Sequence, residues 1–187
     1  LIVNKHLKIS SFNCKFLKSS VEEVKQLCDQ SDVIVLQETW LMDSELHILS
    51  SIHSEFYAKG LSCMDTSDSL VSIRKGGIAI LWRKSLGYKT SVTEYNDPAL
   101  MALELTSEDT SMLVVNVYLP YDQGDNLDDY KDYMSQIESI VSDFKTPLVY
   151  VIGDYNANIR EINGCIQKRF GKELVQFCAN ESLVISD

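Results

Sequence analysis

The order of the expected elements predicts an α/β fold in which two β-sheets pack face to face with helices outside. Helix and strand patterns alternate near both ends of the 187-residue chain and flank a run of adjacent strand patterns in the middle. Hydrophobic residues make up 45% of the chain and charged residues 24%, which are globular values. At this length we expect one domain with its own core, spanning residues 1–187.

The first part of the chain contains strand, helix, strand and helix patterns in turn. Ser20 and Glu23 fit a capping box, and apolar residues then recur at helical spacing. A short continuous apolar run follows, which predicts a strand buried on both faces. The elements expected here are a strand over Lys8–Asn13, a helix over Ser20–Asp29, a strand over Asp32–Gln37 and a weaker helix over Ser44–Ile52.

The middle of the chain is rich in strand patterns separated by turn residues. The polar, Ser-rich stretch Leu61–Lys75 predicts a loop, and a Gly-Gly pair opens the strand after it. The strands expected here are Phe56–Ala58, Gly77–Trp82, Tyr88–Glu94, Ala99–Thr106 and Met112–Tyr118.

The last part contains the clearest helix pattern. Over Asp125–Phe144 apolar residues recur every three or four positions, and acidic residues fill the first turn, where the helix dipole favours them. These acidic residues lack the spacing of a calcium loop. The other elements expected here are a buried strand over Leu148–Gly153, a helix over Gly171–Ala179 and the start of a strand over Leu183–Ser186.

Composition excludes several classes of protein. The net charge of −10 argues against a protein that holds nucleic acid mainly by counterion release, but it is compatible with an enzyme that meets phosphates through a cation. No apolar run reaches the roughly 20 residues that span a bilayer, and the first residues lack the pattern of a signal peptide. The five cysteines form no Cys-x-x-Cys pair, which argues against zinc. We therefore expect reduced thiols, a nuclear or cytoplasmic location rather than secretion, and no membrane partner.

Polar residues end four of the expected strands. They are Asn13, Glu38, Tyr118 and Asp154, with Asn156 two residues further on. Each residue alone could be an ordinary turn, loop or packing residue. Together they predict a site, because ligands in α/β proteins bind beyond strand ends and oxygen-rich side chains suit a hard cation such as Mg²⁺.

Five segments in this order resemble the endonuclease/exonuclease/phosphatase superfamily: SFNCKFL, VIVLQETW, GGIAILWRKSL, VVNVYLPY and VIGDYNANI. Within this superfamily, the segments LQETW and GGIAILWRKSL are most similar to the apurinic-like endonuclease domain of non-LTR (LINE-type) retrotransposons. The resemblance implies a four-layered α/β sandwich of two packed mixed sheets flanked by helices. It also implies a Mg²⁺-dependent phosphodiesterase, able to use Mn²⁺, that nicks DNA as part of a longer polyprotein with a reverse transcriptase.

The resemblance also assigns roles to the strand-end residues. Glu38 of the Q-E-T segment would be a metal ligand, and Asn13 would lie at the metal and orient the phosphate. Tyr118 would donate to the scissile phosphate. Asp154 and Asn156 of G-D-x-N would orient or deprotonate the attacking water and stabilise the transition state.

One departure from the family pattern affects the expected activity. The family has a final Asp-His pair in an S-D-H motif, whereas His6, His47 and His53 all precede the Asp154 motif. We therefore expect a fragment that lacks its last strands and is not a competent nuclease alone; a degenerate copy is the other explanation. The alternatives in function are another superfamily branch (abasic-site endonuclease, deadenylase or phosphoinositide phosphatase) and a non-catalytic remnant.

Two further features allow both a functional and an ordinary interpretation. Basic residues near strand and helix ends could contact a phosphate backbone or lie in solvent. Trp40 could stack on a base or pack beneath the site. The basic residues are Arg74, Lys75, Arg83, Lys84, Lys168, Arg169 and Lys172.

Overall fold

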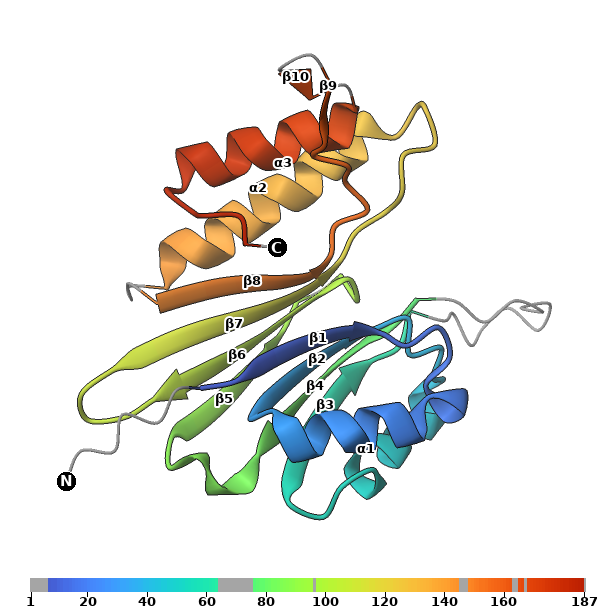
Figure 1. Cartoon of the computed structure of the whole chain (residues 1–187), viewed down its shortest axis with the longest axis vertical. Helices are drawn as coiled ribbons and strands as arrows, with labels where there is room; N and C mark the ends of the chain where they lie inside the picture. Colours follow the sequence, from blue (N-terminus) through green and yellow to red (C-terminus); the bar gives the residue numbers. More distant parts are fainter. Residues whose placement is uncertain are drawn as a thin grey trace. The chain divides into compact units, whose positions relative to one another are not determined.

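The structure, a computed structural model, describes residues 7–63, 76–95, 97–144, 148–162, 165–166 and 168–186. The chain divides into two compact units (Figure 1). The first unit comprises Leu1–Tyr118 and Thr146–Asp154, and the second comprises Leu119–Lys145 and Tyr155–Asp187.

A mixed four-stranded sheet with the strand order β1-β2-β4-β3 forms one half of the first unit. Strands β1 and β2 run parallel, and the other neighbours are antiparallel. Alternate residues of β2 point to opposite faces, and helix α1 covers the face that holds Ile34 and Leu36, contributing Val24 and Cys28 to one apolar cluster. The bounds are β1 Ile9–Asn13, α1 Val21–Gln30, β2 Val33–Gln37, β3 Phe56–Leu61 and β4 Ile78–Arg83.

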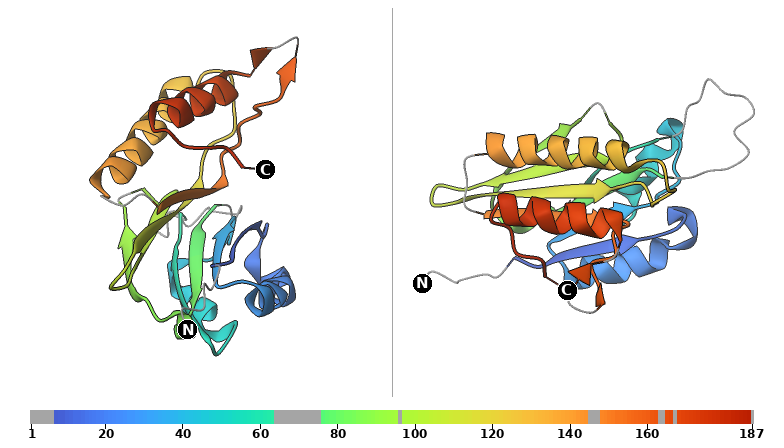
Figure 2. Two further views of the ribbon diagram at one scale, coloured as in Figure 1. Left: turned by 60° about the vertical axis from the view of Figure 1, so that its left-hand side comes forward. Right: turned by 90° about the horizontal axis from the view of Figure 1, so that it is seen from above.

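The second mixed sheet has the order β5-β6-β7-β8, with β7 and β8 parallel. It packs on the other face of the first sheet, where Val33 and Val35 share an apolar cluster with Leu103 and Val114. Figure 2 shows these layers of the first unit, with α1 outermost beside β1 and β2. The bounds are β5 Lys89–Glu94, β6 Leu100–Thr106, β7 Ser111–Tyr118 and β8 Leu148–Asp154.

The second unit is built on two helices that lie side by side, α2 (Leu127–Asp143) and α3 (Arg169–Asn180) (Figures 1 and 2). The rings of Tyr130 and Phe170 stack between them at 3.9 Å. The Tyr130 hydroxyl donates to the Tyr155 carbonyl at 3.2 Å, which ties the chain after β8 to α2. A hairpin of two-residue strands, β9 (Glu161–Ile162) and β10 (Cys165–Ile166), precedes α3; such short strands leave no periodic pattern in a sequence.

Several sequence predictions need correction. The capping box is not formed, because the Ser20 hydroxyl donates to the Cys14 carbonyl at 2.8 Å instead. The weaker helix is a 3-10 helix, η2 (Asp43–Ser51). Leu183–Ser186 forms no strand, and Val184 is 91% exposed. Strand β8 ends the order of its sheet and exposes Leu148 and Tyr150, so it is not buried throughout.

The predicted α/β class is confirmed, with two mixed four-stranded sheets packed face to face and a helix outside. The predicted strands and the three longer helices all lie within a few residues of their observed bounds, apart from Leu183–Ser186. Most of the predicted loop Leu61–Lys75 lies outside the described residues. Within the described ranges, no helix combines the length and apolarity needed to cross a bilayer.

Candidate active site

Two polar residues leave the first sheet at the same edge. Asn13 is the last residue of β1, and Glu38 directly follows β2. Because β1 and β2 are parallel with Asn13 opposite Gln37, their carboxyl ends meet at one edge of the sheet. This is the position at which α/β sheets bind ligands.

Two further residues leave the second sheet together. Tyr118 ends β7 and Asp154 ends β8, and the two face each other in the parallel register. Gly153 allows this close pairing, since its φ is 150° and a Cβ there would lie 2.0 Å from the Val117 carbonyl oxygen. A side chain at residue 153 would therefore displace the Asp154 backbone.

The Asn13 side chain joins the two pairs. Its amide nitrogen donates to Glu38 Oε1 at 2.7 Å and to Asp154 Oδ2 at 2.9 Å. Its oxygen accepts from the Lys15 backbone N–H at 3.3 Å. The amide therefore holds two carboxylates from different sheets beside one another, and oxygen atoms of both acids line the space around it.

The Tyr118 hydroxyl completes the cluster through a hydrogen bond to the Glu38 carboxylate. Burial, together with the nearby charges of Glu38 and Asp154, raises the pKa of Tyr118 to about 12. Tyr118 is thus a neutral donor throughout the physiological pH range.

Strained backbone gathers in the loops that leave β1 and β2. Glu38 has a φ of 54° and Trp40 a φ of 53°, and Lys15 and Phe16 are also positive at 41° and 89°. Each such non-glycine residue costs of order 1–3 kcal/mol and persists only where its surroundings hold it. The strain therefore lies at the sheet edge that carries Asn13 and Glu38, as is common at functional sites.

Backbone hydrogen bonds hold the segment after β2 from both sides. Thr39 and Trp40 donate to the carbonyls of Gly77 and Gly76 at 3.1 and 3.0 Å. On the other side, the Glu38 carbonyl accepts from Phe16 at 2.9 Å. A Cβ at Gly77, whose φ is 79°, would lie 2.7 Å from Thr39 Oγ1, so the Gly-Gly pair allows the two segments to approach.

Cys14 is a further residue of this edge that the sequence did not single out. Its thiol donates to the Gln37 carbonyl at 3.1 Å, and burial raises the pKa of Cys14 to about 12. The thiol therefore stays protonated and ties the end of β1 to the residue before Glu38. In the sequence, only the position of Cys14 beside Asn13 could have indicated that Cys14 belongs to this edge.

The donor set fits a hard divalent cation better than zinc. Within the described ranges, no group of three or more His, Cys, Asp or Glu side chains is arranged to hold a metal ion. Mg²⁺ commonly uses one or two carboxylates and keeps waters or substrate phosphates as its other ligands. Glu38 and Asp154 could supply those carboxylates. Glu38 has only neutral partners, Asn13 and Tyr118, among the described residues.

The structure brings together four of the five predicted site residues. Asn13, Glu38, Tyr118 and Asp154 lie in the first unit and form the cluster described above. Asn156 belongs to the second unit, where its amide donates to the Leu119 carbonyl at 2.8 Å. The chemical roles of all five, including metal ligation by Asn13, stay predictions.

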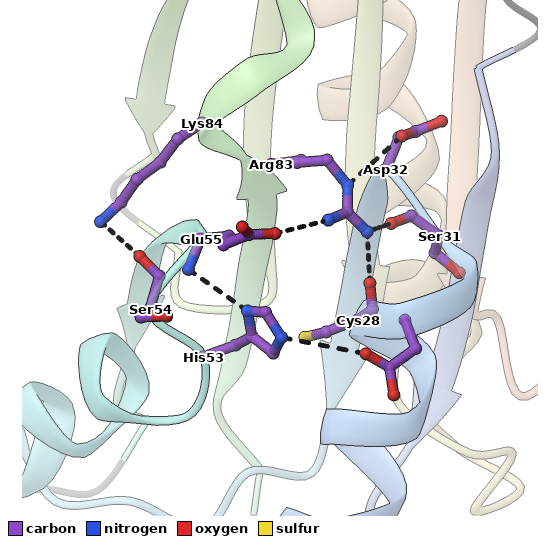
Figure 3. Close-up of polar contacts among 9 residues, drawn as sticks. Cys28, Ser31, Asp32, His53, Ser54, Glu55, Arg83 and Lys84 are labelled. Carbon is purple, nitrogen blue, oxygen red and sulfur yellow. Dashed lines mark hydrogen bonds and ion pairs between the residues drawn. The ribbon is translucent and has the colours of Figure 1, made fainter.

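Arg83 is neither solvated nor free for a phosphate. Its guanidinium donates to carbonyls at the end of α1 and pairs with two carboxylates, at the edge of the sheet opposite Glu38 (Figure 3). These partners are the carbonyls of Cys28 and, at 2.9 Å, Ser31, together with Asp32 at 3.5 Å and Glu55 at 3.3 Å. Arg83 therefore caps the helix.

Two other basic residues are bonded within the protein. Lys84 donates to the Ser54 carbonyl at 2.8 Å (Figure 3). In the second unit, Arg169 pairs with Asp122, and this hydrogen bond lowers the pKa of Asp122. Arg74 and Lys75 lie outside the described residues.

Trp40 packs beside the site. Its ring lies 6.0 Å from that of Phe16, tilted by 35°. Its indole nitrogen is buried and finds no hydrogen-bond partner among the described residues. The contact with Phe16 favours packing over base stacking for this residue.

Comparison with known proteins identifies the family. Residues 10–177 match the Endonuclease/Exonuclease/phosphatase family. The chain belongs to this family. Its members are generally hydrolases that use divalent metal ions, and they include nucleases and phosphatases.

Solved structures of low sequence identity share the fold. An AP endonuclease from Leishmania major has a TM-score of 0.67 and 13% identity, over 94% of this chain and 66% of that one. A 3′ phosphatase from Neisseria, bound to a product DNA hairpin, has a TM-score of 0.65 and 14% identity, over 92% and 71%. The endonuclease domain of TRAS1, a telomere-specific non-LTR retrotransposon, has a TM-score of 0.63 and 12% identity, over 94% and 72%.

Two curated relatives are much longer than the matched region. Craniofacial development protein 2 of Bos taurus is 22% identical over 149 residues, which cover 72% of this chain and 25% of that protein. The protein of the same name from Tragulus javanicus is 21% identical over 96% of this chain and 31% of its own length. The chain thus spans a quarter to a third of these relatives.

Proposed function

We propose that this chain is the phosphodiesterase domain of a Mg²⁺-dependent endonuclease that nicks DNA, and that Mn²⁺ can replace Mg²⁺. The observation that carries the proposal is the Asn13 amide, which holds Glu38 and Asp154 from two sheets beside one another. Two carboxylates kept this close repel each other, and a divalent cation would relieve that repulsion. The same cation would attract a phosphate despite the net charge of −10.

The side chains of the cluster would divide the work. Glu38 would hold the cation, with Asn13 beside it fixing the carboxylate orientation. Tyr118, kept protonated, would donate a hydrogen bond to a phosphate oxygen. Asp154 would orient and deprotonate the attacking water, and Asn156 would stabilise the developing charge. When bound, the cation would polarise the phosphoryl oxygen and neutralise negative charge.

The nucleic-acid substrate and the retrotransposon origin are supported by resemblance. One structural neighbour is a retrotransposon endonuclease domain, and another binds a DNA product. The LQETW segment around Glu38 resembles the sequence of LINE-type endonucleases. We propose accordingly a nuclear or cytoplasmic protein whose polypeptide also contains a reverse transcriptase.

A substrate panel tests this proposal. A form of the protein that also contains the family's final Asp-His pair would be incubated with Mg²⁺ and supercoiled plasmid, with a duplex containing one abasic site, and with a soluble phosphoinositide. The 187-residue chain, which we expect to be inactive alone, would be assayed beside it. The proposal expects nicked plasmid, and it fails if only the abasic duplex or the phosphoinositide is cleaved, since those results identify another branch of the family. Absence of all three activities would favour a non-catalytic role.

The roles of Asp154 and Asn156 can be tested by kinetics on the cleaved substrate. We expect alanine at either position to lower kcat strongly and to leave KM nearly unchanged, because both are assigned to the chemical step. A change confined to KM would assign them to substrate binding instead.

A further inference from the structure

Two buried amide side chains link the two sheets directly beneath the candidate site. Gln37 ends β2 in the first sheet, and Asn116 lies on β7 in the second. Both are buried, with exposed fractions of 1% and 0%. Gln37 Nε2 donates to Asn116 Oδ1 at 2.8 Å, so the amides form one bridge between the sheets.

The hydrogen bonds of the bridge are largely satisfied. Asn116 Nδ2 donates to the Leu36 carbonyl at 3.0 Å and to the Ala79 carbonyl at 2.9 Å. The Ser11 hydroxyl donates to Gln37 Oε1 at 3.2 Å. The Asn116 carboxamide thus contacts β2 and β4 at residues that pair with each other, Leu36 and Ala79. Such contacts fit only one relative position of the two sheets.

The apolar surroundings argue that the bridge is not there for stability alone. The neighbouring residues between the sheets are aliphatic, including Val35, Ile80 and Val114. Replacing a buried polar pair by apolar side chains of similar size is often neutral or stabilising, whereas removing one partner is costly. What a satisfied polar pair adds is a defined register, which an aliphatic contact does not impose.

The position of the bridge connects it with the site. Gln37 is bonded covalently to Glu38, and Asn116 lies two residues before Tyr118 on the same strand. Glu38 and Tyr118 come from different sheets and meet through a hydrogen bond. A shift of one sheet over the other would therefore move these two groups apart.

We propose that Gln37 and Asn116 are a positioning pair that fixes the sheet register on which cation binding at Glu38 depends. This inference rests on the proposed function, since it assumes that Glu38 holds a divalent cation. Neither residue touches the cation or the substrate. They act by placing Glu38, Asn13 and Tyr118 relative to one another.

Mn²⁺ binding by the 187-residue chain tests the inference. The variants are Asn116→Leu, Gln37→Met and their combination, measured by calorimetry with Mn²⁺ and by urea unfolding. We expect each single variant to lose stability, because it leaves the other amide buried without its partner. We expect the double variant to regain part of this stability, since the Leu36 and Ala79 carbonyls still lack the Asn116 donor. We expect it to bind Mn²⁺ about 10–100-fold more weakly, as is typical when groups that orient a metal ligand are lost.

Leu105→Ala is the matched control. Leu105 is buried between the same sheets, opposite Met112 at the other end of β7 from Tyr118. It should lose stability and keep Mn²⁺ affinity. A double variant that binds Mn²⁺ like the parent would overturn the positioning role, because affinity would then follow stability alone.

Two measurements separate this inference from the proposed function. If the parent chain binds no Mn²⁺, or binds it equally well after Glu38→Gln, the proposed function is wrong. The Asn13 side-chain NH₂ signals in ¹H–¹⁵N spectra report the site without metal, because both hydrogens face carboxylates. We expect these signals to move in the double variant, and unchanged signals would overturn the inference whether or not Mn²⁺ binds.

Discussion

The carboxylates at the two ends of the first sheet have different kinds of partner. At one end, Glu38 is bonded to the neutral groups Asn13 and Tyr118. At the other end, Asp32 and Glu55 both pair with the Arg83 guanidinium (Figure 3). The first sheet thus has at one end carboxylates that pair with a cation, and at the other a carboxylate with no cationic partner among the described residues.

The difference distinguishes a structural cluster from the candidate site. The Arg83 guanidinium donates to the carbonyls at the end of α1 and pairs with two carboxylates. These partners occupy its donors, so no donor is left for a ligand. The end with Glu38 carries positive φ at Glu38 and Trp40 in addition to its charge. The charge of a carboxylate without a cationic partner is a cost that binding a cation would offset.

The largest effect is expected from removing charge at the uncompensated end. Glu38→Gln keeps the side-chain size but removes the charge. We therefore expect Mn²⁺ binding to be largely lost, and Mg²⁺-dependent cleavage by a form that also contains the family's final Asp-His pair to fall by roughly 10²–10³-fold. Calorimetry and plasmid nicking measure the two quantities. Glu22→Gln, on the exposed face of α1, is the control and should change neither. A Glu38→Gln protein that cleaves within a few-fold of the parent would show that the charge contrast has no catalytic meaning.

A stability change without a binding change is expected at the compensated end. Arg83→Met leaves two carboxylates and two helix-end carbonyls without their donor, and we expect the free energy of unfolding to fall by about 2–4 kcal/mol. Urea unfolding measures this loss, and Mn²⁺ affinity should stay unchanged. Lys84→Met, which removes one exposed bond to the Ser54 carbonyl, should cost much less. Weaker Mn²⁺ binding in Arg83→Met would mean that the two ends are coupled.

Alkaline pH should destabilise both ends alike. Burial raises the pKa of Cys14 from 9.0 to about 12 and that of Cys28 from 9.0 to about 11. Above pH 9 these thiols ionise in the unfolded chain but not in the folded one, so the free energy of unfolding falls as pH rises toward the folded pKa values. Urea unfolding over this range should show a shallower slope in a Cys14→Ala, Cys28→Ala variant. An unchanged slope would mean that neither thiol is buried as described.

The smallest effect is expected at the start of α1, which lies at the end of the sheet that holds Asn13. Ser20→Ala removes the hydroxyl bond to the Cys14 carbonyl, worth about 1 kcal/mol. Since Ser20 makes no capping bond, helix content by circular dichroism should not change. A fall in helix content would restore the capping box as the explanation.

Sequence patterns predicted the strands of the inner core well, because β2, β4, β6 and β7 are largely continuous apolar runs in buried sheets. They failed where side chains had a choice of partner or where elements were very short. The sequence pattern at Ser20 is the same whether its hydroxyl caps the helix or bonds elsewhere. The nearby Cys14 carbonyl, which accepts from this hydroxyl, decides the outcome. The apolar residues of Leu183–Ser186 predict a strand, but in the described structure no neighbouring strand pairs with them. The sequence alone does not indicate whether a partner strand is present.

The candidate site was predicted as a set of residues but not as a geometry. Strand ends and family resemblance indicated Asn13 and Asp154, yet 141 residues separate them, and no local pattern reports which atoms meet. The amides Gln37 and Asn116 did leave a signal, because Asn116 interrupts an apolar run and Gln37 ends one. That signal has meaning only once the two strands are known to face each other.

The bond between Asn13 and Asp154 also sets the order in which the protein can acquire its site during synthesis. Asp154 ends β8, which pairs beside β7 after the whole of α2 has been made. Contacts between such distant residues form late in folding, because a long loop must close first. A nascent chain that contains Asn13 and Glu38 but not β8 therefore carries an open, one-carboxylate edge. Assembly of the pair of acids marks the moment at which β8 has joined the second sheet.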